Sequence, residues 1–147
     1  MNKYLLIFLF FFICSCDNSE QEKTTFFPHR LDSVPYSESV LVGDILYISG
    51  QIANLEDDYN KIIDGGIKAQ VHQTMLNIQT ILEKHKATMD DIVRCTCILA
   101  DGDDWGAMSE EYVKFFKNHK PARTTFGGAE LGKDILVEIE CIAKIDR

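Results

Sequence analysis

The sequence predicts an α+β fold in which one mixed sheet carries two helices on the same face. Two alternating segments around Gly43-Asp44 read as a hairpin, a long stretch repeats apolar residues every three or four positions, and another alternating strand closes the chain. Because strands are adjacent at both ends and helices lie between them, one layer of helices is expected. The other face of the sheet keeps apolar residues, so we expect self-association to cover it.

The elements are expected in the order β-β-α-β-α-β-β, with short strands possible before them. The expected bounds are a hairpin over 39–50, a helix over 67–86, a strand over 92–100, a helix over 105–118, and strands over 123–129 and 135–145. The acidic turn 101–104 can cap the second helix. The strand before that turn is expected to be buried on both faces apart from Arg94 and Thr96. On the first helix, Gln70 and Asn77 are assigned structural roles.

Length and charge limit the class of function. The chain has 147 residues, which suffices for one domain once a leader is removed. Its net charge of −8 argues against nucleic acid as a partner, because phosphate neutralisation needs clustered Lys and Arg. The electrostatic field of this net negative charge repels anions mildly, so an anionic ligand would have to be held by a local cation.

The first residues read as a leader. Lys3 is followed by the apolar run Leu5–Ile13, which is too short to span a membrane and is typical of a secretory signal. Cys16 then sits at the acceptor position of a segment that resembles a bacterial lipobox. We therefore expect a signal peptide over 1–15, an acidic tether over 16–24 and the folded domain over 25–147, in an extracytoplasmic protein anchored to the membrane by lipid on Cys16. An ordinary signal peptide or an anchor helix is the alternative.

Three cysteines remain in the expected domain: Cys95, Cys97 and Cys141. An odd number excludes a complete disulfide framework. Cys95 and Cys97 lie two apart on one strand face, with side chains parallel rather than facing each other, and are expected to be small buried residues. No second Cys or His pair accompanies them, so no metal is expected.

The candidate site lies within residues 121–140. Arg123 opens one strand, and Glu138 and Glu140 share a face of the next. Two strands joined by a turn would place Arg123 across from Glu138. Such a pair forms either a structural ion pair or half of a small-molecule site, with Glu140 the weaker candidate of the two carboxylates.

Several stretches taken in order resemble the Rid (YjgF-type) imine/enamine deaminase family. They span about 34–143 and comprise Pro35-Tyr36-Ser37, Leu46–Gln51, Gln70, Asn77-Ile78, Ile81-Leu82, Tyr112, Phe115-Phe116, Pro121–Thr124, Val137–Glu140 and Ile142-Ala143. The resemblance implies a chorismate-mutase-like α+β fold. It also implies a homotrimer with three sites in the clefts between subunits, in agreement with the uncovered sheet face.

The resemblance also assigns roles. Arg123 would bind the carboxylate of a substrate, which suits the bidentate geometry of a guanidinium. Glu138 would orient a water, Tyr36 would reach the site, Ser49-Gly50 would form its floor, and the Thr125 backbone would add polar groups. The implied reaction is hydrolysis of small 2-imino or 2-enamino acids to 2-oxo acids and ammonia, with no cofactor and no metal.

The sequence departs from the pattern of close relatives at four positions. Thr125, Gly132 and Ser109 stand where a cysteine, a proline and an asparagine are common, and Phe126 is bulkier than the usual aliphatic residue. These changes leave Arg123 in place but bear on the substrate range. Two other functions remain open: a protein that binds a carboxylate ligand without turning it over, and a trimeric scaffold with a vestigial site.

Overall fold

The computed structural model describes residues 22–55 and 58–145. The predicted signal peptide, the lipidation site Cys16 and most of the tether lie outside the described residues. Among the helices that are described, none is long and apolar enough to cross a membrane.

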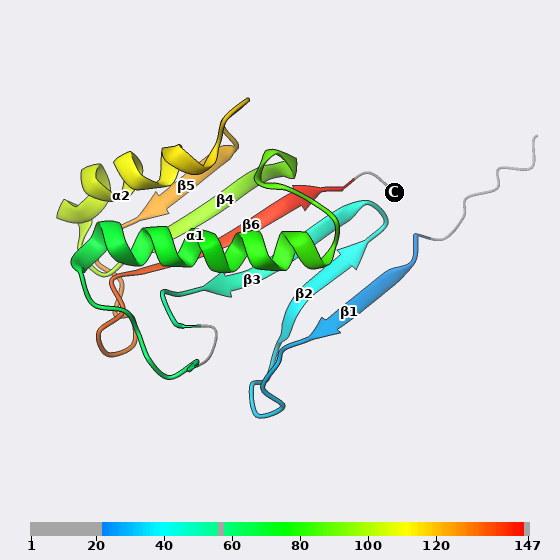
Figure 1. The fold of residues 1–147 in the computed structure, drawn as a ribbon, viewed down its shortest axis with the longest axis horizontal. Helices are drawn as coiled ribbons and strands as arrows, with labels where there is room; N and C mark the ends of the chain where they lie inside the picture. Colours follow the sequence, from blue (N-terminus) through cyan, green and yellow to red (C-terminus); the bar gives the residue numbers. More distant parts are fainter. Residues whose placement is uncertain (1–21, 56–57, 146–147) are drawn as a thin grey trace, which may run out of the picture.

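Six strands form one mixed sheet (Figure 1) in the order β1-β2-β3-β6-β4-β5. Their bounds are β1 Thr24–Pro28, β2 Ser37–Val42, β3 Ile45–Gln51, β4 Ile92–Leu99, β5 Ala122–Phe126 and β6 Val137–Lys144. Neighbouring strands are antiparallel except for β4 and β5, which run parallel. The strand β1 corresponds to the possible short strand predicted before the hairpin. The last strand, β6, lies in the middle of the sheet.

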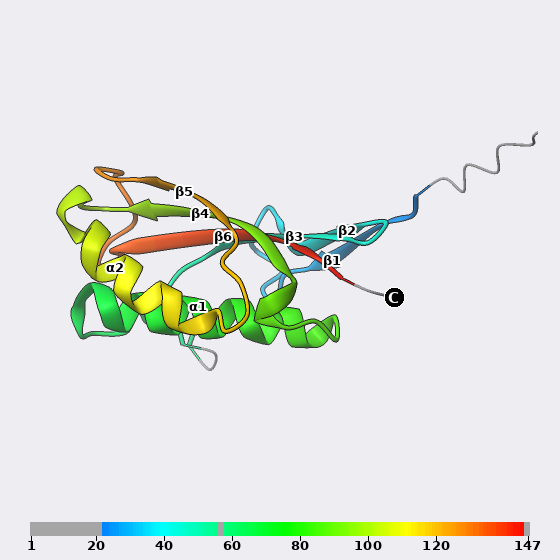
Figure 2. The same ribbon diagram turned by 90° about the horizontal axis from the view of Figure 1, so that it is seen from above.

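Both helices cover the same face of the sheet, as predicted. In Figure 2, α1 (Gly66–Lys84) and α2 (Trp105–Tyr112) lie together on one side of the strand layer. The second helix is shorter than expected: the α-helix ends at Tyr112 and a 3-10 turn, Val113–Phe115, replaces its predicted continuation. The mixed sheet and its two helices confirm the predicted α+β class.

The apolar stripe of α1 provides much of the core. Its Val71, Met75, Ile78 and Leu82 are completely buried against the sheet, where Leu46 of β3 is buried as well. Burying an aliphatic side chain of this size contributes roughly 1.5–3 kcal/mol. The predicted three-to-four residue spacing therefore identified the face that fixes α1 on the sheet.

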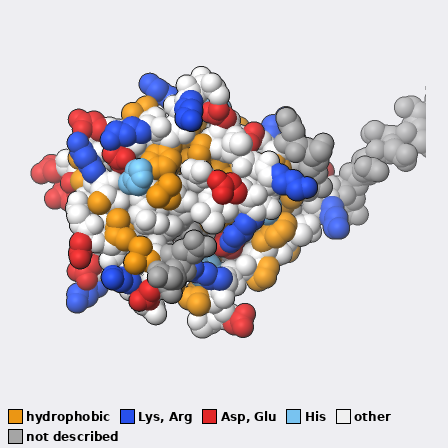
Figure 3. All heavy atoms as spheres, viewed as in Figure 1, with side chains coloured by type: hydrophobic (Ala, Val, Ile, Leu, Met, Phe, Trp, Pro, Cys, Tyr) orange, Lys and Arg blue, Asp and Glu red, His pale blue; other side chains and the backbone are white. Residues whose placement is uncertain are grey.

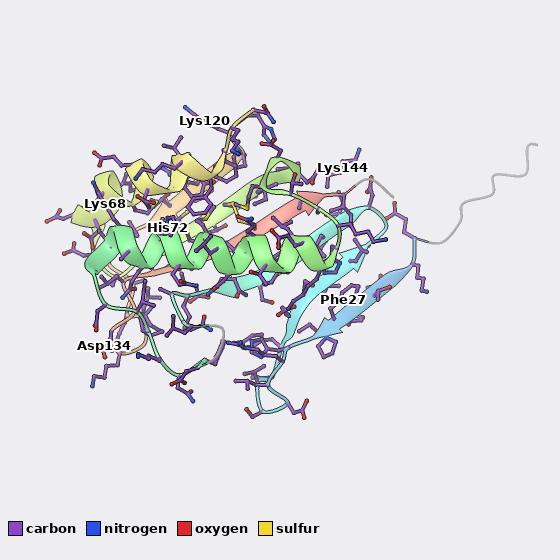
Figure 4. All side chains as sticks on the ribbon, in the orientation of Figure 1. Phe27, Lys68, His72, Lys120, Asp134 and Lys144 are labelled. Atoms are coloured by element: carbon purple, nitrogen blue, oxygen red, sulfur yellow. A yellow bond between two sulfur atoms is a disulfide. The ribbon has the colours of Figure 1, made fainter. Side chains whose placement is uncertain are left out.

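Polar contacts join the two helices along their solvent side. Lys68 and His72 of α1, labelled in Figure 4, bond to Glu110 and Glu111 of α2 at 2.6 Å and 2.9 Å. Elsewhere on the view of Figure 3, charged side chains of both signs are interspersed rather than clustered.

The structural roles expected for Gln70 and Asn77 are confirmed. Gln70 is buried and bonds to the Asp134 carbonyl and the Leu136 amide, both at 2.8 Å, so α1 holds the segment that leads into β6. Asn77 donates to the carbonyl oxygen of Ile52 at 2.9 Å. Buried amides with such partners stabilise loops that have no ladder of their own.

The face turned away from the helices is apolar and open. Three large side chains on it, Phe26, Tyr47 and Phe126, are at least 46% exposed, and Val93 at the irregular start of β4 is 48% exposed. Val93 corrects the prediction that β4 is buried on both faces apart from Arg94 and Thr96. The register shift of β4 against β6 between Ile92 and Arg94 accompanies this exposure.

Candidate functional site

Arg123 lies on the edge strand β5, on the sheet face that α2 covers. Its parallel register partner is the buried Cys95 of β4. The guanidinium donates from Nη2 to Ser109 Oγ at 3.0 Å and lies over two aromatic rings, with its carbon 5.1 Å from the centre of Tyr112 and 5.9 Å from that of Trp105. Nη1 also donates to Met108 Sδ at 3.8 Å, so cation–π contacts and two hydrogen bonds orient the fork.

The charge of Arg123 is left without an acidic partner. Within residues 22–55 and 58–145, no Asp or Glu forms an ion pair with it. The side chain is nevertheless half-buried, so part of its hydration is lost. A partly desolvated guanidinium with most of its five donors unused is suited to a carboxylate that arrives with a ligand.

Glu138 lies on the opposite face of the sheet, against a glycine. It alternates with the buried Val137 and Ile139 on β6. A Cβ atom placed on Gly50 would lie 1.9 Å from Glu138 Oε1, so only glycine permits this approach. Burial, and secondly the charge of Glu140, raise the pKa of Glu138. Glu138, one of the predicted site residues, therefore packs directly against Gly50, another of them.

Tyr36 and Tyr59 form a hydroxyl pair near this carboxylate. Their oxygen atoms lie 3.1 Å apart, and the His29 ring makes edge contacts with both tyrosine rings. Burial and the bond to Tyr36 raise the pKa of Tyr59 to about 12, and the charge of Glu138 contributes in the same direction. Tyr59 is therefore neutral at physiological pH and can donate a hydrogen bond.

The structure corrects the expected placement of Arg123 across from Glu138. The β4–α2–β5 crossover sets β5 beside β4, so β4 separates the two strands: Arg123 pairs with Cys95, and Glu138 pairs with Ile98 three residues further along. Two strand spacings and three residues place their Cα atoms roughly 14 Å apart. Since the two side chains also leave opposite faces, one small ligand cannot contact both within a single copy of the chain.

The remaining predicted site residues divide between these two places. Thr125 follows Arg123 on the same face, and its buried hydroxyl has no hydrogen-bond partner among the described residues. Ser49 belongs to the irregular segment beside Gly50 and donates to the Ser37 carbonyl at 2.7 Å. The arrangement is therefore a cationic half around Arg123 and an acidic, tyrosine-lined half around Glu138.

Sequence reasoning missed Trp105 and Tyr59 as neighbours of the site. Trp105 is the only tryptophan in the chain, and its side chain is 47% exposed. Its position four residues before Ser109 was the signal that the sequence offered. Tyr59 lies in an irregular acidic loop that carries no periodic pattern. A groove of about 350 Å³ runs along α1 and is lined by His29, Gln51 and Tyr59, so it adjoins the tyrosine-lined half. Among the described residues, no group of His, Cys, Asp and Glu could hold a metal ion.

The mixed sheet with both helices on one face (Figure 2) makes the described residues a small α+β domain. The comparisons identify the family. The model of the endoribonuclease L-PSP family matches residues 28–145, so the chain belongs to this family, which includes the RutC and Rid proteins. The resemblance drawn from the sequence motifs is thereby confirmed at the level of the family.

Three relatives illustrate the match. A RutC family protein of Pyrococcus abyssi is 38% identical over 74% of this chain and 85% of its own length. The human 2-iminobutanoate/2-iminopropanoate deaminase is 35% identical over 74% of this chain and 79% of its own length. The crystal structure of RidA from a Psychrobacter species has a TM-score of 0.70 and 32% identity, over 86% of this chain and 99% of that one. Other relatives carry different names, among them a putative regulator in Lactococcus lactis.

Proposed function

We propose that the protein hydrolyses small 2-imino or 2-enamino acids to 2-oxo acids and ammonia, with Arg123 holding the substrate carboxylate. The observation that carries the proposal is the half-buried guanidinium, which is oriented by Ser109 and two aromatic rings and is unpaired by any described carboxylate. The names of the human and Dermatophagoides farinae relatives support the choice of an imine as the reacting group.

The chemistry needs positioning more than a reactive side chain. Water adds across the C=N bond of the protonated imine, giving a carbinolamine that loses ammonia and leaves the 2-oxo acid. Glu138 orients the water and takes its proton, for which a raised pKa is suitable because it makes the carboxylate a stronger base. Tyr36 contributes a hydroxyl that pairs with the hydroxyl of Tyr59. A fixed substrate plane on Arg123 lowers the entropic part of the barrier.

The complete site forms between copies of the chain. Arg123 and Glu138 lie on opposite faces within one copy, so a shared ligand requires the cationic half of one subunit to meet the acidic half of another. The exposed side chains Phe26, Tyr47 and Phe126 offer the apolar surface that such an assembly would bury. A homotrimer with three clefts is the assembly we propose.

The protein is further proposed to act outside the cytoplasm, anchored through lipid on Cys16. The apolar run before Cys16 and the acidic segment after it support this placement. A cell that processes the chain should yield a membrane-bound form, and Cys16→Ala should release it into the soluble fraction. Unchanged membrane association of that variant would contradict the lipid anchor.

Binding of a carboxylate ligand without turnover is the second candidate. Two points favour it: none of the described contacts of Arg123 is an activated nucleophile, and the protein is expected outside the cytoplasm. RNA cleavage, which the name of the family suggests, is not favoured, since a net charge of −8 opposes phosphate binding.

The test generates the imino acid in place. An amino-acid oxidase would supply it to the purified full-length protein, and formation of the 2-oxo acid would be followed. Wild type should accelerate the reaction over buffer, and Arg123→Ala should lose roughly 100-fold in kcat/KM. Arg94→Ala is the matched control, because Arg94 is an exposed arginine on the adjacent strand. Equal activity in Arg123→Ala refutes the role of the anchor, and ligand recovered unchanged in an Arg123-dependent complex selects the binding function.

A further inference from the structure

Cys95 and Cys141 are joined by a disulfide in the middle of the sheet. They are direct register partners on β4 and β6, with Cα atoms 4.2 Å apart. Both are almost fully buried, at 1% and 2% exposure. The expectation that Cys95 is merely a small buried residue is therefore wrong, because a strand separated from it by 46 residues supplies its partner.

The position of this bond relates it to the two halves of the candidate site. On one side, Cys95 is the register partner of Arg123 on β5. On the other side, Cys141 pairs with Ile48 of β3, next to the segment that contains Gly50. The disulfide thus links the strand that supports the cationic half to the strand that carries Glu138. The loop that it closes contains α2 and β5 entire.

The third cysteine is kept out of this pairing. Cys97 follows Cys95 on the same face of β4, but its partner on β6 is Ile139, and it is a buried free thiol. Burial raises the pKa of Cys97 to about 11. Since the thiolate is the species that attacks a disulfide, Cys97 has little capacity to exchange with the bond beside it.

We propose that Cys95–Cys141 is a permanent clamp, formed once during folding, that fixes the register of β4 on β6 and makes the full stability of the mature fold dependent on an oxidising compartment. The two thiols lose two protons and two electrons, and a disulfide-bearing oxidant takes them up and becomes two thiols. After folding, burial prevents access of reductants, so the bond is cleaved only when the sheet opens. This inference does not rest on the proposed enzymatic activity.

The first test asks whether the bond exists in the protein. Full-length chain isolated from an oxidising compartment would be unfolded in guanidinium and alkylated without reductant, and its peptides identified by mass spectrometry. The peptides of Cys95 and Cys141 should be recovered cross-linked, with Cys97 alkylated. Alkylation of all three residues overturns the proposal.

The second test asks whether the bond acts as a clamp. Closing a loop of this size should raise Tm by roughly 10–15 °C, so reduction after unfolding should lower Tm by that amount on refolding. The Cys95→Ala/Cys141→Ala variant should show the low Tm with no response to reductant, whereas Cys97→Ala should keep the response of wild type. If the double variant does not fold, the comparison of oxidised with reduced wild type decides alone. Equal Tm values for these two forms overturn the clamp.

The third test uses the rate of reduction. Thiols should appear in the folded protein under dithiothreitol only as fast as the sheet opens, and at least tenfold faster once a sub-denaturing concentration of urea is added. Rapid reduction of the folded protein without urea would instead identify an accessible, reversible bond. All three readouts are independent of turnover, so the failure of the deaminase hypothesis and the failure of the clamp are distinguishable.

Discussion

Replacing Gly50 with alanine tests the acidic half of the site directly. The added Cβ would lie 1.9 Å from Glu138 Oε1, 2.9 Å from its Cδ and 3.1 Å from its Cγ, whereas ordinary contacts begin at 3.4 Å. The carboxylate therefore has to move by about 1.5 Å, and a displacement of about 1 Å at a reacting group can cost 100-fold in rate. Because the end of a flexible side chain gives way rather than the backbone, the fold itself should lose only about 1 kcal/mol.

The assay combines turnover with thermal unfolding. For Gly50→Ala, kcat/KM for the imino acid should fall about 100-fold while Tm changes by only a few degrees. The same substitution in a Glu138→Ala background should have no further effect on Tm, because the clashing atoms are gone, and this double-mutant cycle isolates the contact. Wild-type turnover in Gly50→Ala would refute the assignment of Glu138, since a displaced carboxylate could not still orient the water.

Three further substitutions test the charges. Arg123→Lys keeps the charge but loses the fork, so KM should rise about tenfold with little change in Tm, measured by steady-state kinetics. The hydrogen bond from Lys114 is the main cause of the lowered pKa of Glu111. The ionised Glu111 therefore stabilises the folded protein at neutral pH, and this stabilisation is lost as the pH falls through the pKa of Glu111 in the folded state. Glu111→Gln should therefore lower Tm by about 2 °C at pH 7 and match wild type below pH ~3, and a constant difference would contradict the ion pair. The raised pKa of Glu138 has the opposite effect on stability. The protonated Glu138 favours the folded state in acid, and this contribution is lost as the pH rises through the pKa of Glu138 in the folded state. Glu138→Gln should be the more stable form at pH 8 and converge with wild type near pH 4 in calorimetric scans.

Local patterns predicted the parts of the fold that depend on neighbouring residues. The hairpin around Gly43 follows from alternation and from a turn in which this glycine adopts φ +59°. The stripe of α1 and the alternation of β6 follow from burial on one face. The end of α2 was misplaced because Phe115 and Phe116 continue an apolar pattern through a 3-10 turn, which periodicity does not distinguish from a helix.

Long-range pairings could not be predicted in the same way. Nothing in residues 121–140 indicates that β4 lies between the strands of Arg123 and Glu138, since strand order is a property of the whole chain. The disulfide partner of Cys95 could not be predicted either, because the pairing of β4 with β6 is also a property of the whole chain. The residue types alone identified each half of the candidate site. The distance between the two halves follows only from the order of the strands in the sheet.

The central position of β6 has a consequence for how the chain becomes a protein. Its neighbours β3 and β4 end at Gln51 and Leu99. Both pair with a strand that begins only at Val137. The ladders that unite the sheet therefore join residues far apart in sequence, a topology that folds slowly. A ribosome must release nearly the entire chain before the two halves of the sheet can close, so the nascent polypeptide stays open throughout its synthesis. A chain in this condition can still be threaded through a translocation pore, and removal of its last strand would leave two unconnected half-sheets.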